Sequence, residues 1–456
     1  MSCDKKMNFE ECELAVLRSA VDKIDKKSGR KKINDPDIKE IIRIVEDFLK
    51  LSKRVCYGGT AINNILPEQD KFYNKNVEIP DYDFFSPNPV ECSKKLADIF
   101  FKEGYTEIEA KAGIHNGTYK VFVNFIPLAD ITFLDKSLFN NLMKKSIKIN
   151  GISYCPPDYL RMSMYLELSR PMGDVSRWEK VLKRLILLNK NYPLKGNNCK
   201  NIDFLRNYED SKEIADDIYK VVRKSIINQG LIFFGGYAAS LYGKYMPKRE
   251  RKQLSTIPDF DILSDDAKSS AYIIKEQLIH EGFKNIIINK KLGINDIISE
   301  HYEVMIKNNN KIDVLCYVYN TTSCHSYNVI YINGEKLKIA TIDTMLSFYL
   351  IFIFINRPYY DLNRLLCMSE YLFKVQLRNR LEQKGLLRRF SINCYGKHHT
   401  LEDIRSDKAK KYKELRQKNL KSGNKEYDRY FLRYIPSNLS KTKQIKRNNY
   451  KKTKKK

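Results

Sequence analysis

Two aspartates, Asp81 and Asp83, stand one residue apart, so on a strand both carboxylates would leave the same face. A third, Asp130, interrupts the otherwise apolar segment 121–134, where a charge is costly unless it has a partner. Carboxylates with no Cys or His close by in the sequence are the donors that Mg²⁺ or Mn²⁺ prefers. We therefore predict that Asp81, Asp83 and Asp130 are catalytic residues that hold two such ions.

A glycine pair precedes these carboxylates by some twenty residues. Gly58 and Gly59 would let the backbone approach phosphate oxygens, and a helix starting at Thr60 would turn its free N–H groups toward the anion. Each element alone is more simply an ordinary turn or a solvated strand edge. Together they predict nucleotidyl transfer, in which a 3′-hydroxyl attacks the α-phosphorus of a nucleoside triphosphate and two metal ions neutralise the charge.

Basic residues in the segment 157–188 could help to hold the triphosphate. Arg177 and Lys180 lie three residues apart and would share one helical face. A solvated face of a basic helix explains them equally well. Trp178 and Tyr165 could stack on adenine, but aromatic residues at helical spacing more often pack in a core, so no residue is assigned to base selection.

The second half of the chain repeats the pattern. Gly235 follows Gly58 by 177 residues, Asp259 follows Asp81 by 178, and Asp313 follows Asp130 by 183, which indicates a duplication. The second copy also has Asp261, but Tyr237 replaces the small hydroxyl residue after the glycines. We expect a degenerate copy with a structural role, closing an RNA channel or forming a dimer interface.

Hydrophobic spacing predicts an α+β chain. Helices are expected over 38–49, 60–66, 89–104 and 157–188, and strands over 55–57 and 121–134. A Pro, Gly and Asn-rich stretch at 189–201 is the best candidate for a linker. The predicted organisation is a helical lead-in (1–50), a catalytic nucleotidyltransferase domain (51–150), a helical subdomain (151–195), a second nucleotidyltransferase-like domain (196–340), a second helical subdomain (341–400) and a basic C-terminal extension with a disordered end (401–456).

The net charge of +27 predicts a polyanionic partner, with a merely soluble basic surface as the alternative. Residues 401–456 alone hold 20 Lys and Arg against 6 Asp and Glu. No apolar run approaches the ~20 residues that span a bilayer, and the start has no signal-peptide pattern. The ten cysteines include no Cys-x-x-Cys pair, so we expect neither structural zinc nor a disulfide framework, and a reducing intracellular setting.

Segments 57–62 (YGGTAI), 80–88 (PDYDFFSPN), 157–159 (PDY) and 174–180 (DVSRWEK) together resemble the poly(A) polymerase catalytic subunits of nucleocytoplasmic large DNA viruses, of the giant-virus and African swine fever virus type and more distantly of poxviruses. The resemblance implies a polymerase β-like nucleotidyltransferase fold that uses ATP to add poly(A) to RNA 3′ ends without a template. It makes Asp81, Asp83 and Asp130 the metal ligands and residues 58–60 the triphosphate loop.

The resemblance also implies an RNA 3′ end and ATP as partners, allows a homodimer, gives no role to a membrane, and places the protein in the viral factory of the host cytoplasm or in the virion. Two other functions remain open. One is a tRNA-end or oligoadenylate-type nucleotidyltransferase built on the same site. The other is an RNA-binding scaffold or processivity protein derived from such an enzyme.

Overall fold

The helix expected over residues 38–49 is α2 (Pro36–Ser52) in the computed structural model of the protein. Asp35 caps this helix by accepting a hydrogen bond from the Asp37 amide, and Lys53 ends it in the left-handed conformation. Its apolar residues recur every three to four positions and are buried against a sheet. The structure describes residues 7–74, 78–201, 212–251, 260–294, 297–308, 311–355, 357, 359–379 and 382–437.

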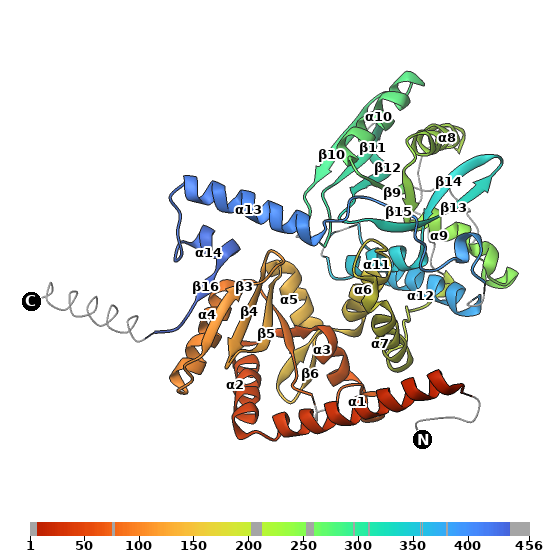
Figure 1. The fold of residues 1–456 in the computed structure, drawn as a ribbon. Coiled ribbons are helices and arrows are strands. Elements are labelled where there is room, and N and C mark those ends of the chain that lie inside the picture. The colour runs from red at the N-terminus through yellow and green to blue at the C-terminus, as the bar shows by residue number, and fades with distance from the viewer. Residues whose placement is uncertain are drawn as a thin grey trace, which may run out of the picture. The chain divides into compact units, whose positions relative to one another are not determined.

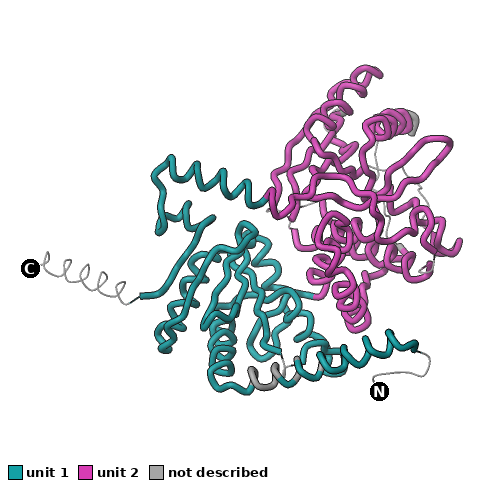
Figure 2. Tube along the Cα trace, viewed as in Figure 1, with its two compact units in different colours: residues 1–156, 404–456 teal, residues 157–403 magenta. Residues whose placement is uncertain are grey.

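The chain divides into two compact units, residues 1–156 with 404–456, and residues 157–403 (Figure 2). The elements of the first unit, most of them labelled in Figure 1, run from α1 to β16. They are α1 (Phe9–Ile33), α2, β1 (Val55–Tyr57), α3 (Gly58–Ile65), β2 (Tyr82–Ser86), α4 (Pro89–Lys102), β3 (Ile108–Ala112), β4 (Thr118–Val123), β5 (Ile126–Phe133), α5 (Lys136–Lys145), β6 (Ile147–Ile149), β7 (Ile152–Tyr154), α14 (Lys425–Phe431) and β16 (Arg433–Tyr434).

The second unit repeats this plan (Figure 1). It contains α6 (Pro157–Leu168), α7 (Trp178–Asn191), α8 (Lys212–Asn228), β8 (Ile232–Phe234), α9 (Gly235–Leu241), β9 (Phe260–Ser264), α10 (Ala267–His280), β10 (Ile286–Lys291), β11 (His301–Asn308), β12 (Lys311–Asn320), β13 (His325–Ile332), β14 (Glu335–Ala340), α11 (Ile342–Phe352), α12 (Leu362–Arg378) and β15 (Cys394–Tyr395). Helix α13 (Leu401–Gln417) crosses the division between the units.

Strand order confirms the duplication. In the described residues the first sheet runs β16-β3-β4-β5-β2-β1-β7-β6 and the second β10-β11-β12-β9-β8-β14-β13-β15. Apart from β16 and β15, each an added edge strand, the two orders match strand for strand, and so do the parallel and antiparallel pairings. Helices α2 and α4 pack on the first sheet as α8 and α10 pack on the second.

Several sequence-based boundaries need correction. The strand expected over 121–134 is a hairpin of β4 and β5, because Asn124 and Phe125 turn the chain with positive φ angles. The helices expected within 157–188 exist, but they fall in the second unit, so the compact units divide at residue 156. The basic extension is folded up to Ser437 and adds β16 to the edge of β3. Its predicted disordered end lies outside the described residues.

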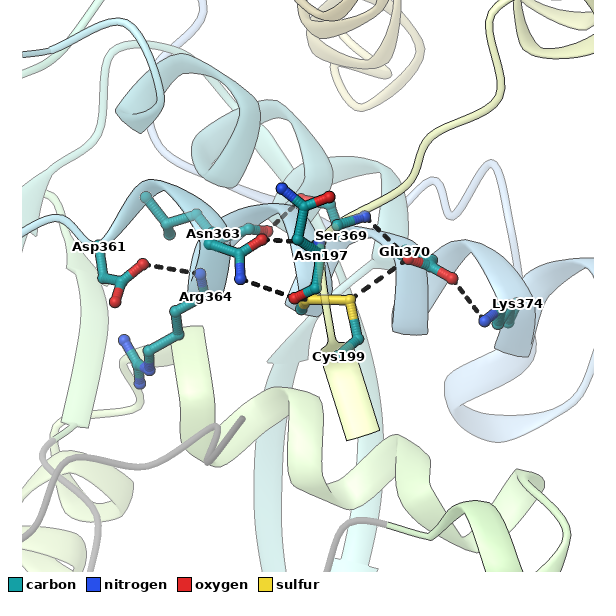
Figure 3. The surroundings of a disulfide bond; sticks show 11 residues. Asn197, Cys199, Asp361, Asn363, Arg364, Ser369, Glu370 and Lys374 are labelled. Carbon is teal, nitrogen blue, oxygen red and sulfur yellow. Dashed lines mark hydrogen bonds and ion pairs between the residues drawn. A yellow bond between two sulfur atoms is a disulfide. The ribbon is translucent and has the colours of Figure 1, made fainter. Parts of the chain in front are cut away.

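The stretch expected to be a linker, 189–201, is fastened to α12 (Figure 3). Cys199 and Cys367 form a disulfide with a Cα–Cα distance of 5.3 Å. Asn197 and Asn363 exchange two hydrogen bonds of 2.8 and 2.7 Å between side chain and backbone. A second disulfide joins Cys324 and Cys394, 70 residues apart. The expectation of no disulfides is therefore wrong, because pairs so distant in sequence leave no local motif.

No helix among the described residues is long and apolar enough to cross a bilayer.

Candidate active site

Strand β2 brings two of the predicted carboxylates together. It lies between β1 and β5, with Asp83 directly opposite Tyr57 on one side and opposite Asp130 on the other. Neighbouring strands are about 4.8 Å apart and register partners share a face, so Asp83 and Asp130 present adjacent half-buried carboxylates. Asp81 precedes β2 and is more exposed. The pairing of Asp83 with Asp130 agrees with the predicted site.

Position 58 must be a glycine for Asp83 to occupy its place in this arrangement. Its φ angle is +74°, and a Cβ atom added there would lie 2.3 Å from Asp83 Oδ2. The carboxylate therefore packs directly against the glycine backbone, where no side chain fits. Helix α3 begins at the same residue, and no side chain caps its N-terminus. Its first N–H groups are thus free of the side-chain cap that would compete with an anion.

Thr60 has a structural role that the sequence did not indicate. Its hydroxyl donates a 2.6 Å hydrogen bond to the Asp81 backbone carbonyl, and the residue is only 5% exposed. This bond ties the start of α3 to the residue just before β2. Thr60 therefore positions Asp81, and its contact with a phosphate stays a prediction.

Lys120 supplies positive charge that the sequence analysis missed. It lies opposite Asp130 across the β4–β5 hairpin and forms an ion pair with its carboxylate. Nearby protein raises the pKa of Asp81 by displacing water, and the Asp130 charge raises it further, while Lys120 partly offsets both effects. Burial and the Asp83 charge likewise raise the pKa of Tyr57. The position of Lys120 opposite Asp130 follows from the pairing of β4 (residues 118–123) with β5 (residues 126–133), and a prediction of this hairpin would have identified Lys120.

The donor set fits a hard divalent cation, although the described residues contain no group of three His, Cys, Asp or Glu side chains close enough to hold one. Asp83 and Asp130 are adjacent, and the pKa of Asp81 is raised first by burial and then by the Asp130 charge, whose repulsion a bound cation would relieve. Oxygen donors suit Mg²⁺ or Mn²⁺. The three carboxylates as ligands of two ions stay a prediction.

The predicted triphosphate contacts from the second unit also stay predictions. Arg177 lies 3.3 Å from Glu167 and its side chain is 57% exposed, and Lys180 is exposed. Trp178 donates a 3.1 Å hydrogen bond from Nε1 to the Glu167 carbonyl, and Tyr165 is fully buried. Core packing therefore explains Tyr165 in this structure.

The second copy reproduces the glycine but not the carboxylate pair. A Cβ on Gly235 would lie 1.9 Å from Asp261 Oδ2, as at the first site. Opposite Asp261 on β12, however, stands Tyr317. Asp313 lies four residues earlier, so its predicted equivalence to Asp130 is wrong. Opposite Tyr317 on β11 is Glu303, where the first copy has Lys120.

The space beside Asp261 is also closed. The cavity there is about 20 Å³ and is lined by Tyr349, Phe352, Tyr359 and Tyr360, among others, far below the 300 Å³ or more of small-molecule pockets. Tyr237 is buried and accepts a 3.2 Å hydrogen bond from Arg223. These side chains support the prediction that the second copy is degenerate. Asp259 lies outside the described residues.

Comparisons with known proteins agree with this geometry. Residues 43–174 match the family model "Poly(A) polymerase catalytic subunit". A protein of Acanthamoeba polyphaga mimivirus that carries this name is 34% identical over 158 residues, or 34% of this chain and 26% of that protein. One of African swine fever virus (strain Badajoz 1971 Vero-adapted) is 31% identical over 171 residues, or 36% of each chain. The matched region thus spans only about a quarter to a third of these relatives.

The crystal structure of the Megavirus polyadenylate synthase aligns with 100% of this chain and 91% of its own length, at a TM-score of 0.77 and 21% identity. This likeness shows the fold across both units. The predicted α+β fold, duplicated in the second half, and the predicted resemblance of residues 43–174 to viral poly(A) polymerase catalytic subunits are therefore confirmed.

Proposed function

We propose that the protein is a template-independent polynucleotide adenylyltransferase that adds poly(A) to RNA 3′ ends from ATP. The observation that carries this proposal is the register of β2, which sets Asp83 against Gly58 on one side and beside Asp130 on the other. The names of the matched relatives and of the structural neighbour support adenylate as the transferred group, and RNA as the acceptor follows from the resemblance.

Each residue has a definable task in this reaction. The uncapped start of α3, with Gly58 and Gly59, would bind the triphosphate through backbone N–H groups. Asp81, Asp83 and Asp130 would hold two divalent ions, Mg²⁺ or Mn²⁺, which when bound supply positive charge to the transferring phosphoryl group. Thr60 fixes the position of Asp81 through its backbone. Lys120 offsets the negative charge of the cluster.

The basic extension supports RNA as the polyanionic substrate, since residues 401–456 hold 20 Lys and Arg. We also propose a role for Arg177 and Lys180 at the triphosphate, which rests on the helical face that they share. A homodimer and a location in the host cytoplasm or the virion are further parts of the proposal that the structure does not test.

Primer extension tests the proposal. The full-length chain is incubated with Mg²⁺ or Mn²⁺, an unstructured RNA primer and one NTP at a time, and product lengths are resolved on a gel. We expect long products with ATP and short or no products with the other three. Addition of only a few nucleotides, or 2′–5′ linked products, would indicate the tRNA-end or oligoadenylate alternative. Absence of any extension together with RNA binding would indicate a scaffold.

A further inference from the structure

A cavity of about 490 Å³ lies in the first unit, apart from the Asp83 and Asp130 carboxylates. Its walls are α2, α3, the residues before β2 and the β6–β7 hairpin. Asp83 and Asp130 do not line it; the cavity touches the candidate active site only through Asp81 and Thr60. Its volume falls within the 300–1,000 Å³ of pockets that bind drug-sized molecules and cofactors.

Its polar groups are held in place and keep hydrogen-bonding capacity for a ligand. Asn64 Nδ2 donates a 2.9 Å bond to the Tyr154 hydroxyl, so the Tyr154 proton and Asn64 Oδ1 have no partner among the described residues. Tyr82 donates a 2.6 Å bond to Glu46 Oε1, which leaves Oε2 as an acceptor. Both tyrosines are only 3% exposed. The hydrogen bonds and burial fix these side chains before any ligand arrives.

The chemistry of this lining matches a nucleotide. The Tyr154 hydroxyl can donate a hydrogen bond, and Asn64 Oδ1 and Glu46 Oε2 can accept one. These groups complement the edge of a nucleobase, which carries both donors and acceptors. The Tyr73 ring and the Ile42 side chain offer apolar surface for a planar base. Lys39, which is exposed and has no ion pair among the described residues, supplies a cation for a phosphate.

We propose that this cavity is a second nucleotide-binding site, with the base against Tyr154 and Asn64 and a phosphate toward Lys39. The occupant is either a free nucleotide or an unstacked nucleotide of an RNA. The ligand bears on the active site through α3. Asn63 Oδ1 of this helix accepts 2.9 and 2.8 Å bonds from the Phe72 and Tyr73 amides, and Thr60 of the same helix holds the Asp81 backbone.

Hydrogen exchange of the full-length chain in EDTA, read by mass spectrometry, tests this site. EDTA removes divalent ions from the carboxylate site, and no turnover is needed, so the outcome does not depend on the proposed function. The added probes are AMP, a short oligoadenylate and inorganic phosphate, each at millimolar concentration. We expect AMP, the oligoadenylate or both to slow exchange of the Phe72 and Tyr73 amides at least about twofold, with the effective probe identifying the source.

Two variants locate the binding. Ile42→Trp should fill the cavity and raise the concentration needed for protection at least about tenfold, while Ile279→Trp, at an exposed position on α10, should not change it. Tyr154→Phe removes only the hydroxyl and should weaken binding several-fold, which keeps the test valid if Ile42→Trp fails to fold. The proposal is overturned by no protection with either nucleotide probe, by equal protection with phosphate, or by an unchanged response in folded Ile42→Trp and in Tyr154→Phe.

Discussion

At the scale of single residues, the contact between Gly58 and Asp83 couples the glycine loop to the carboxylate site. A Cβ at position 58 would collide with Asp83 Oδ2 at 2.3 Å, so the glycine is needed for more than its φ of +74°. From the sequence, Gly58 is predicted to serve phosphate binding alone. The packing is not predictable there, because the two residues are 25 positions apart and meet only through the β1–β2 pairing.

Gly58→Ala should therefore reduce primer extension by a hundredfold or more, because it displaces a carboxylate from the reacting centre as well as straining the backbone. Gly104→Ala is the matched control: its φ is +97°, but nothing lies within 4 Å of an added Cβ. The control should share a modest loss of thermal stability and keep most of the activity. Equal activity losses in the two variants would show that strain alone matters.

The raised pKa of Asp81 predicts a pH effect on stability. Because the folded protein binds this proton more tightly than the unfolded chain does, the group's stabilising contribution is present below the ordinary Asp pKa of about 4 and is lost as the pH rises through the raised pKa. In EDTA, Asp81→Asn should melt on the order of 1–2 °C above wild type at pH 7 and not at pH 4. The effect is small because Asp81 is partly exposed. A variant that melts lower at pH 7 would contradict the assignment.

At the scale of helices and strands, local sequence patterns predicted the elements that neighbouring residues form. The strand ending at Tyr57, the helix after the glycines and α4 were predictable from hydrophobic spacing and turn residues. The predicted equivalence of Asp313 to Asp130 is wrong because similar offsets along the chain, 177 to 183 residues, do not fix the register of a strand pair. Only the pairing of β9 with β12 shows that Tyr317 faces Asp261.

In the C-terminal extension, Asp428 and Asp407 should differ in how much each stabilises the fold. Asp428 is buried, accepts a 2.7 Å bond from Lys94 and a 3.0 Å bond from the Gly423 amide, and so fastens α14 beside α4 and β3. Asp428→Ala should lower the free energy of unfolding by about 2–4 kcal/mol, because it leaves these groups without a partner. Asp407→Ala removes only an exposed pair with Lys410 and should cost less than about 0.5 kcal/mol. Chemical denaturation checks both, and similar costs would refute a structural role for the extension.

At the scale of the whole molecule, the sequence predicted a duplicated α+β chain but not the disulfides that cross-link its second unit. The disulfides Cys199–Cys367 and Cys324–Cys394 join segments 168 and 70 residues apart, and no spacing rule identifies such partners. The closed second site was predictable only in part. Tyr237 indicated a degenerate loop, whereas Tyr359 and Tyr360 reach the cavity beside Asp261 from a segment a hundred residues away.

The uneven charge of the chain predicts how RNA affinity depends on salt. Residues 438–456 contain nine Lys and Arg and no acidic residue. Replacing them with a Gly-Ser segment of equal length should make the plot of log affinity against log salt concentration shallower, by about 0.7 for each RNA phosphate that the segment neutralises. Titration of a labelled RNA at several KCl concentrations measures the slope. An unchanged slope would exclude this segment from RNA binding.

The central claim is that the carboxylates of the first unit, and not those of its copy, perform nucleotidyl transfer. The most direct measurement compares ATP-dependent primer extension by Asp83→Asn and Asp261→Asn, which alter the same position in the two units. We predict that Asp83→Asn loses on the order of a thousandfold in rate while Asp261→Asn, if folded, stays within a few-fold of wild type. Near-normal extension by a folded Asp83→Asn, or its loss in a folded Asp261→Asn alone, would contradict the account.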